Sequence, residues 1–327
     1  AGQVETIGLS QGRVVLATSG YRYDAASDTL QDLINDQACT PGEAEDEEGH
    51  FVCEDGTVIS PGWVAPIGVR NYSDILANEN IRGPFFGVFI WNLVFAFLSV
   101  LFTFALGLGL ALTVQHSRFR GKLFFRSIFI LPYAVPAFLS ILIWQGLLNS
   151  QYGQVNELLG ALGLGPVRWL TDPFWAKVAV LLVNTWLGFP YMFLISMGAL
   201  TSIPVELQEA ARVDGASAFG VFRRVTFPLL MVGLAPLLIG SFAFNFNNFV
   251  IIYLLTTGGP PILTAAVPVG ATDILITFTF DLVVAGGGGN RYGLGAAITV
   301  FIFLMVTIIS AISFRFTRRL EEIYGSL

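Results

Sequence analysis

Five apolar runs, each long enough to cross a lipid bilayer and each without an Asp, Glu, Lys, Arg or His, constrain the fold of this chain most strongly. A helix rises about 1.5 Å per residue, so roughly 20 residues cross a hydrocarbon core of about 30 Å. Only 12% of the residues are charged, compared with about 25% in soluble domains. We therefore predict an all-α polytopic membrane protein with five transmembrane helices, at about Phe85–Val114, Ile128–Leu148, Ala179–Leu200, Leu229–Leu255 and Ala296–Phe314.

Positive charges gather in alternate connections between these runs. Lys and Arg accumulate in short cytoplasmic loops, so the richer connections and the C-terminus are expected in the cytoplasm. The N-terminal region is then expected outside the cytoplasm. The first connection holds Arg118, Arg120 and Lys122, the third holds Arg212, Arg223 and Arg224, and the C-terminal segment holds Arg315, Arg318 and Arg319. The second holds only Arg168, with Lys177 at the edge of the following span, and the fourth holds only Arg291.

Residues 1–82 differ from the rest in charge, with 4 Lys or Arg against 14 Asp or Glu. Short alternating stretches at Val14–Leu16 and Phe51–Cys53 indicate strands, and the acidic run Glu43–Glu48 indicates a solvated loop. We predict a small β-containing extracytoplasmic segment over 1–82 and a transmembrane domain over 83–327. An external N-terminal region needs a route across the membrane, either further N-terminal spans that are missing from this chain or a cleaved signal.

Cys39 and Cys53 are the only cysteines, and both fall in the segment expected on the oxidising side of the membrane. A disulfide between them is plausible there, and two unpaired thiols are the alternative. Two cysteines without a nearby pattern of acids and histidines do not indicate a metal site.

The third connection, 203–228, has the composition of two short helices. Ala and Glu favour a helix over Val205–Val213 with Pro204 before it, Gly215 interrupts it, and Pro228 opens the next span. Such a pair of helices either presents a surface to another protein or is a solvated connector, and composition does not decide between these readings.

The residues Glu209-Ala210-Ala211, Gly215 and Phe227-Pro228 resemble the EAA-loop signature of ABC-importer permeases, apart from Phe227 where Leu is usual. In that family the loop docks into a cleft of a cytoplasmic ATPase subunit. The resemblance implies coupling roles for Glu209, Ala210, Ala211, Asp214, Gly215 and Pro228. Further segments, 130–136, 184–191, 241–249, 255–260 and the Gly286–Gly289 run, resemble the larger membrane subunit of maltose/maltodextrin importers, so that the likeness covers roughly Gly62 to the C-terminus.

This resemblance also implies partners and a location. It implies a second, smaller permease subunit, two copies of an ATPase that carries ATP and Mg, and an extracytoplasmic sugar-binding protein. The chain would lie among the lipids of the bacterial inner membrane, with no cofactor of its own and no nucleic acid. Residues 1–61 would be the tail of a periplasmic insert.

Two of the apolar runs carry matching polar faces. Residues at helical offsets of 0, 3, 4 and 7 share one face, where amides, hydroxyls and aromatic rings suit a neutral carbohydrate. The same groups also join helices in membranes, and spacing leaves both readings open. The resemblance implies sugar contact at these positions, whereas Asn247 lies off the face and is expected to be structural. The faces consist of Asn184, Leu187, Gly188 and Tyr191, and of Ser241, Phe244, Asn245 and Asn248.

These features predict a permease subunit, not an enzyme, that imports a neutral oligosaccharide such as maltose, maltodextrin or trehalose by alternating access. The chain has no Walker motif, so ATP hydrolysis would belong to the partner. The alternative is an ion-coupled secondary sugar transporter, although proton coupling usually needs carboxylates or His within the membrane. The segment Thr272–Val284 is short and holds Asp273 and Asp281, so we expect it to be interfacial or re-entrant.

Overall fold

A computed structural model of the chain describes residues 5–10, 13–18, 20–42, 49–59, 67–116, 120–285 and 292–324, with side chains from residue 20 to residue 315 within these ranges, Ala285 excepted. The chain divides into two compact units, Ala1–Val69 and Arg70–Leu327. The division falls earlier than the expected boundary at residue 82, because helix α1 (Arg70–Ala77) packs against α2 and α12 of the second unit. The acidic run Glu43–Glu48, the Gly286–Gly289 run, Arg118 and Arg291 lie outside the described residues.

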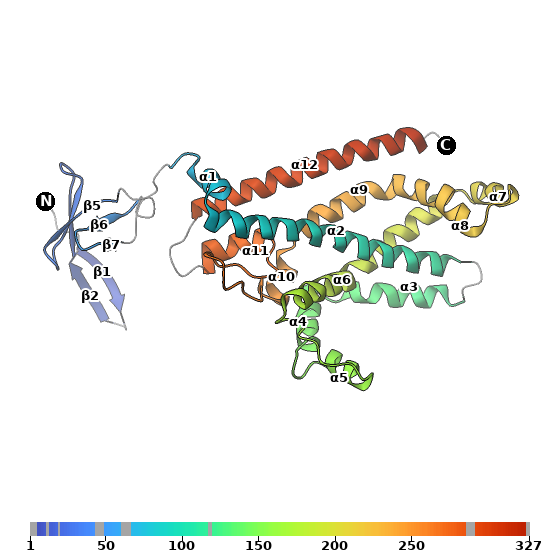
Figure 1. Ribbon diagram of the computed structural model, residues 1–327, viewed down its shortest axis with the longest axis horizontal. Helices are drawn as coiled ribbons and strands as arrows, with labels where there is room; N and C mark the ends of the chain where they lie inside the picture. The colour runs from blue at the N-terminus through green and yellow to red at the C-terminus, as the bar shows by residue number, and fades with distance from the viewer. Residues whose placement is uncertain are drawn as a thin grey trace. The chain divides into compact units, whose positions relative to one another are not determined.

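The first unit consists of short antiparallel strands (Figure 1). β1 (Glu5–Ser10) pairs with β2 (Arg13–Thr18), and a separate five-stranded sheet follows in the order β3-β4-β5-β6-β7. The strands predicted at Val14–Leu16 and Phe51–Cys53 are confirmed as β2 and β6. The five-stranded sheet is formed by β3 (Tyr21–Asp24), β4 (Thr29–Asp32), β5 (Gln37–Pro41), β6 (Phe51–Cys53) and β7 (Val58–Ile59).

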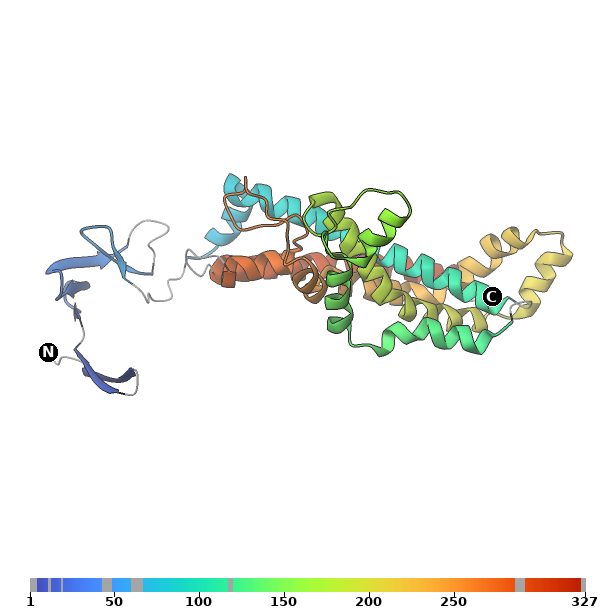
Figure 2. The ribbon, with the colours of Figure 1, turned by 90° about the horizontal axis from the view of Figure 1, so that it is seen from below.

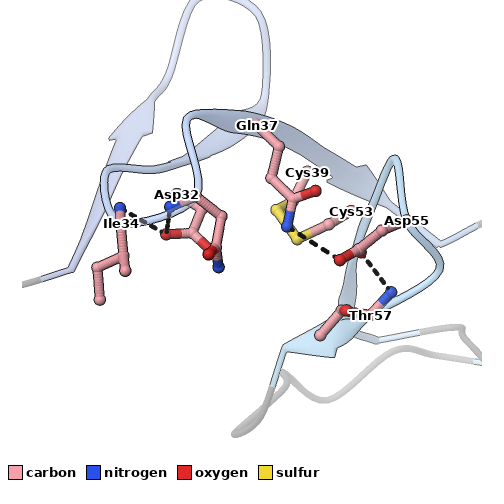
Figure 3. Close-up of a disulfide and its surroundings, with 8 residues drawn as sticks. Asp32, Ile34, Gln37, Cys39, Cys53, Asp55 and Thr57 are labelled. Carbon is pink, nitrogen blue, oxygen red and sulfur yellow. Dashed lines mark hydrogen bonds between the residues drawn. A yellow bond between two sulfur atoms is a disulfide. The ribbon is translucent and has the colours of Figure 1, made fainter.

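A disulfide joins Cys39 of β5 to Cys53 of β6, where the two residues lie opposite each other in the antiparallel register. Both side chains are buried, so the bond forms the centre of this small core (Figure 3). Carboxylates close the neighbouring turns: Asp32 accepts hydrogen bonds from the Ile34 and Asn35 backbone N–H groups. The Ile34 N–H, with help from the Asn35 and Gln37 side chains, holds the pKa of Asp32 below its ordinary value of 3.8.

Among its described residues, the second unit has four helices long and apolar enough to cross a membrane, and a fifth span if one bent pair of helices is counted as one. The bent pair is the run predicted at Ile128–Leu148, which turns by 91° between Ala134 and Ala137. Pro136 explains the bend, because proline cannot donate to a helix ladder and disfavours helical backbone in the preceding residue, and Val135 is extended (φ -89°, ψ 130°). Three of the long helices are α2 (Glu79–Gln115), α6 (Pro173–Ser202) and α12 (Tyr292–Tyr324). The fourth runs from α8 (Ala218–Val221) through the π-helix η2 (Phe222–Thr226) into α9 (Phe227–Phe246). The bent pair consists of α3 (Lys122–Ile130) with the 3-10 helix η1 (Leu131–Ala134), followed by α4 (Ala137–Leu147).

The run predicted as one span over Leu229–Leu255 is wrong in its second half. Helix α9 ends at Phe246, and a separate helix α10 (Phe249–Leu255) begins after Asn247 and Asn248. Asparagine side chains compete with the backbone for hydrogen bonds, which favours a break at this pair. The segment expected to be interfacial or re-entrant forms α11 (Leu275–Phe280) and the π-helix η3 (Asp281–Ala285), and α11 packs against α2, α10 and α12.

The ends of α2 and α12, the start of α3, and the helices α7 (Val205–Val213) and α8 lie at one end of this unit in both views (Figures 1 and 2). Helix α5 (Gln154–Ala161) belongs to the connection between α4 and α6. Helices α2 and α6 approach each other closely at Gly107. A Cβ atom at Gly107 would lie 2.6 Å from the backbone nitrogen of Phe193 and 2.7 Å from the carbonyl carbon of Met192, so only glycine fits there.

Candidate functional site

The second unit contains an open cavity of about 880 Å³ between α2, η1, α4, α6, α9 and α10. All eight residues of the two predicted polar faces line this cavity, so the structure brings both faces to one space. They are Asn184, Leu187, Gly188 and Tyr191 of α6, Ser241, Phe244 and Asn245 of α9, and Asn248 at the break before α10.

The amide groups in the wall bind one another. Asn184 Nδ2 donates to Asn245 Oδ1 over 2.7 Å, and Asn248 Nδ2 lies 3.4 Å from Asn184 Oδ1. Asn245 Nδ2 donates in turn to the carbonyl oxygen of Ser241, 2.8 Å away. Asn184 and Asn245 are buried, with 5% and 7% of their surface exposed. These two residues therefore join α6 to α9, in keeping with the helix-joining alternative.

The aromatic groups and the remaining hydroxyls face the cavity differently. Phe244 is 68% exposed and lies in the cavity wall, so one aromatic surface is available for stacking. Tyr191 and Ser241 are partly buried in the same wall. The space at Gly188 is taken, because a Cβ there would lie 2.7 Å from Thr103 Cγ2 of α2. Gly188 thus permits the approach of α2 instead of leaving room in the cavity.

Sequence reasoning missed a second wall of the cavity. The bend between η1 and α4 contributes Pro132, Tyr133 and Pro136, and Asn247, which was expected to lie off the polar face, also lines the cavity. The two prolines were a usable signal, since a proline-broken helix exposes irregular backbone that membrane proteins place along cavities. Nothing in the sequence locates Thr103 there, because its position depends on where α2 and α6 cross.

None of the lining residues that the structure describes carries an acid or base that is charged at neutral pH. Its polar groups are amides, hydroxyls and backbone, which donate and accept hydrogen bonds without a net charge. Among the described residues, no group of three or more His, Cys, Asp or Glu could hold a metal ion. The chemistry of the wall suits a neutral, hydroxyl-rich molecule with an apolar face.

The predicted coupling residues form a separate surface, distant in sequence from most of the cavity. Helix α7 has no buried residue, and it ends in a Schellman motif: Ala216 N–H donates to the carbonyl of Ala211, and Gly215 N–H to that of Arg212, both over 3.0 Å. Gly215 has φ of 83°, in the left-handed region that this motif requires at its position. The glycine therefore fixes the angle at which α8 follows α7.

The remaining residues of this loop are open to a partner. Glu209, Ala210 and Asp214 are exposed, Ala211 is half-buried, and Val213 at the end of α7 is 87% exposed. An exposed valine beside acidic residues on a short rigid helix is a compact feature for docking in a groove. Pro228 lies apart from this tip, at the second position of α9, directly after the π-helix η2 that joins α9 to α8.

A bundle of membrane-length helices around an uncharged cavity, with an exposed helical loop at one end, defines a multi-spanning membrane permease. Residues 102–322 match the family model described as "Binding-protein-dependent transport system inner membrane component", and the chain belongs to this family. The chain is 46% identical over 305 residues to the maltose/maltodextrin transport system permease protein MalF of Vibrio vulnificus (strain YJ016), which covers 91% of the chain and 58% of that protein. It is 42% identical over 329 residues to the protein of that name from Salmonella typhi, covering 97% of the chain and 63% of that protein. The chain spans about half to two thirds of the length of the curated relatives that it matches.

The fold also has a counterpart among solved structures. A bacterial ABC transporter involved in the import of the acidic polysaccharide alginate superposes with a TM-score of 0.65 at 24% identity, over 80% of this chain and 85% of that one. This likeness shows the shared fold alone, so any cargo of this chain has to be argued from the cavity residues themselves.

Proposed function

We propose that this chain is the permease subunit of an ATP-powered importer and that its cavity receives a neutral oligosaccharide of the maltose/maltodextrin class. The observation that carries the proposal is the absence of charge from the described cavity wall, which combines four amides, four hydroxyls and the exposed ring of Phe244. Amides and hydroxyls exchange hydrogen bonds with sugar hydroxyls, and an aromatic ring packs on the apolar face of a pyranose. The names of the relatives point to the same class of sugar.

The volume and the distribution of polar groups support a direct role in binding. A cavity of about 880 Å³ lies within the range of about 300–1,000 Å³ that is usual for small-ligand sites. Asn184 and Asn245 are largely occupied with each other, so sugar contact falls mainly on Tyr191, Phe244 and Asn248. Trehalose, which has a similar array of hydroxyls, is a further candidate cargo.

The proposed energy source lies in partner subunits. The exposed tip of α7, with Glu209, Asp214 and Gly215, would dock on a cytoplasmic ATPase that binds ATP and Mg. Closure of two ATPase copies would move this loop and turn the cavity from one side of the membrane to the other, which is alternating access. A second, smaller permease subunit would complete the pore, and an extracytoplasmic sugar-binding protein would deliver the cargo.

The proposed orientation places α7 and the C-terminus in the cytoplasm of a bacterium and residues 1–82 outside. The loop residues Arg212, Arg223 and Arg224 lie at the end of the unit where α12 also ends, which is the end expected inside by the distribution of positive charge. Labelling a single cysteine placed at Val213 in a chain whose native cysteines are disulfide-bonded would test this side. Labelling only after the inner face is opened supports the orientation, and labelling from outside contradicts it.

The cargo site is tested by transport of radiolabelled maltose into proteoliposomes that contain the complete complex. Phe244→Ala and Tyr191→Ala are expected to lower uptake about 5- to 150-fold while the complex still assembles, since loss of a stacked or hydrogen-bonded group costs about 1–3 kcal/mol. Leu237→Ala, which truncates an apolar residue of the same wall, is the matched control and is expected to have a smaller effect. Equal uptake by the two aromatic variants and the parent would reject this site.

The coupling role is tested in the same vesicles by comparing ATP hydrolysis with uptake. Glu209→Lys is expected to reduce uptake per ATP hydrolysed without removing the chain from the membrane. Glu206→Lys, one turn earlier on the same exposed helix, is the control. A ratio of uptake to hydrolysis that is unchanged at Glu209 would remove the coupling assignment.

A further inference from the structure

The wall of the cavity depends on a buried amide that does not face the cavity. Asn92 of α2 is fully buried, with 0% of its surface exposed. Its Nδ2 donates to the carbonyl oxygen of Phe246 over 3.0 Å, and its Oδ1 accepts from the backbone N–H of Leu275 over 2.9 Å. One side chain thus binds the main chain of two segments that lie far from α2 in the sequence.

Both bonded groups are ones that a helix leaves without an internal partner. Phe246 is the last residue of α9, and the last carbonyl groups of a helix have no intrahelical donor. Leu275 is the first residue of α11, whose first N–H groups likewise have no intrahelical acceptor. Both residues are buried, so water cannot easily replace the amide. A buried backbone group without a partner is costly, which fixes Asn92 between the two helix ends.

The neighbouring residue, Trp91, binds the same segment before α11. Trp91 Nε1 donates to the carbonyl of Thr272 over 3.1 Å, three residues before Leu275. Lys177 Nζ of α6 lies 4.8 Å from the centre of the Trp91 ring. Since α2, α6 and the start of α11 are held together here, the Phe246 carbonyl is positioned against a fixed support.

Beyond Phe246 the chain enters the cavity wall at once. Asn247, Asn248 and Phe249 all line the cavity, and Asn248 is the one of these that bonds Asn184. The break in the span is therefore located by Asn92, and the location of the break sets where the cavity residues lie. A short break of this kind has no helical ladder to define its backbone, so its geometry follows the bonds made at its ends.

We propose that Asn92 is a positioning residue for the sugar cavity, which acts by holding the break between α9 and α10 against α11. This inference rests on the proposed function for its cargo, although the hydrogen bonds that carry it do not. Asn92 acts through Asn248 and its neighbours and makes no contact with the sugar.

The test measures the Kd of the purified, detergent-solubilised complex for radiolabelled maltose, without the sugar-binding protein. Asn92→Leu removes both hydrogen bonds at similar size and is expected to raise Kd about tenfold or more, with binding stoichiometry per assembled complex retained. A merely structural role would lower the stoichiometry and leave Kd unchanged. Asn92→Gln keeps both hydrogen-bonding groups but displaces them by one methylene, so its Kd is expected to be intermediate.

Ser99→Ala is the matched control. Ser99 lies two turns along the same face of α2, is fully buried, and its hydroxyl has no hydrogen-bond partner among the described residues. Its Kd is expected to equal that of the parent. If Asn92→Leu binds maltose as tightly as Ser99→Ala, the inference is overturned. If the leucine variant does not assemble, Asn92→Gln decides: a raised Kd supports the inference and an unchanged Kd overturns it.

A second measurement separates this inference from the proposed function. A cysteine introduced at Asn247 reports on the break by its rate of thiol labelling, and both native cysteines are disulfide-bonded. The rate is expected to change in the Asn92→Gln background and to stay unchanged with Ser99→Ala. Failure of the parent complex to bind any neutral oligosaccharide would reject the proposed cargo alone, whereas equal labelling rates in both backgrounds would reject the role of Asn92.

Discussion

Replacing Gly107 by alanine is expected to destabilise the crossing of α2 and α6, whereas the same change at Gly109 is not. Both glycines lie within α2, two residues apart and therefore on different faces. A Cβ at Gly107 would lie 2.6 Å from the Phe193 nitrogen and 2.7 Å from the Met192 carbonyl carbon, whereas a Cβ at Gly109 would meet nothing within 4 Å. The atoms approached at Gly107 are backbone, which cannot rotate away as a side chain would.

The magnitude follows from two opposing terms. Alanine is favoured over glycine inside a helix by about 1 kcal/mol, and both variants gain this. Overpacking a close contact costs about 1–3 kcal/mol, and only the Gly107 variant incurs this cost. We therefore expect Gly109→Ala to be slightly more stable than the parent, and Gly107→Ala to be about 1–3 kcal/mol less stable than Gly109→Ala.

The assay is a denaturant titration of the full chain in mixed micelles, followed by tryptophan fluorescence. The comparison of two variants with the same change in composition cancels the propensity term, so the difference in unfolding free energy reports the contact alone. Identical midpoints for the two variants would refute the argument that α2 and α6 meet at Gly107. Because Met192 also lines the cavity, a displaced α6 is expected to weaken maltose binding in the Gly107 variant.

Three further outcomes test other parts of the molecule. Gly215→Ala forces a side chain into a left-handed backbone (φ 83°) at a cost of about 1 kcal/mol, and is expected to lower uptake per ATP in proteoliposomes, unlike Gly198→Ala in α6. Replacing Cys39 and Cys53 by serine opens a loop of sequence separation 14, which is expected to cost about 3 kcal/mol and to be detected as faster proteolysis within 20–59. Because the pKa of Asp32 is lower in the folded state than its ordinary value of 3.8, the ionised carboxylate stabilises the first unit above pH 3.8. This stabilisation is lost as the pH falls through the lower pKa of the folded state. Thermal unfolding measured against pH should lose this acid dependence in Asp32→Asn.

The two polar faces were predictable from sequence because both depend on a local periodicity. Asn184 and Tyr191 share a face in any α-helix, and they share it in α6. The break after Phe246 was not predictable in this way. Two asparagines barely change the mean hydropathy of a long apolar run, and a window average registers length and composition but not a hydrogen bond from Asn92 in another helix.

The bend between η1 and α4 shows a similar limit. Pro132 and Pro136 indicated a deformation, but its direction follows from packing against α6 and α10. Whether that bend faces lipid or the cavity is decided by the tertiary structure. The space beside Gly188 was not predictable for the same reason, since the neighbour that fills it, Thr103, belongs to another helix.

The two readings of the polar faces, sugar site and helix joint, apply to different residues of one wall. Asn184 and Asn245 are buried and hydrogen-bonded to each other across two helices, so their truncation should impair assembly before it affects cargo. Phe244 is exposed and lies in the cavity wall, so its truncation removes contact area that is available to a ligand. A cavity in which buried amides fix the helices and exposed groups meet the sugar can keep its shape while empty. Such preorganisation lowers the cost of ordering the wall when a sugar enters, and it explains why one helical face carries both kinds of residue.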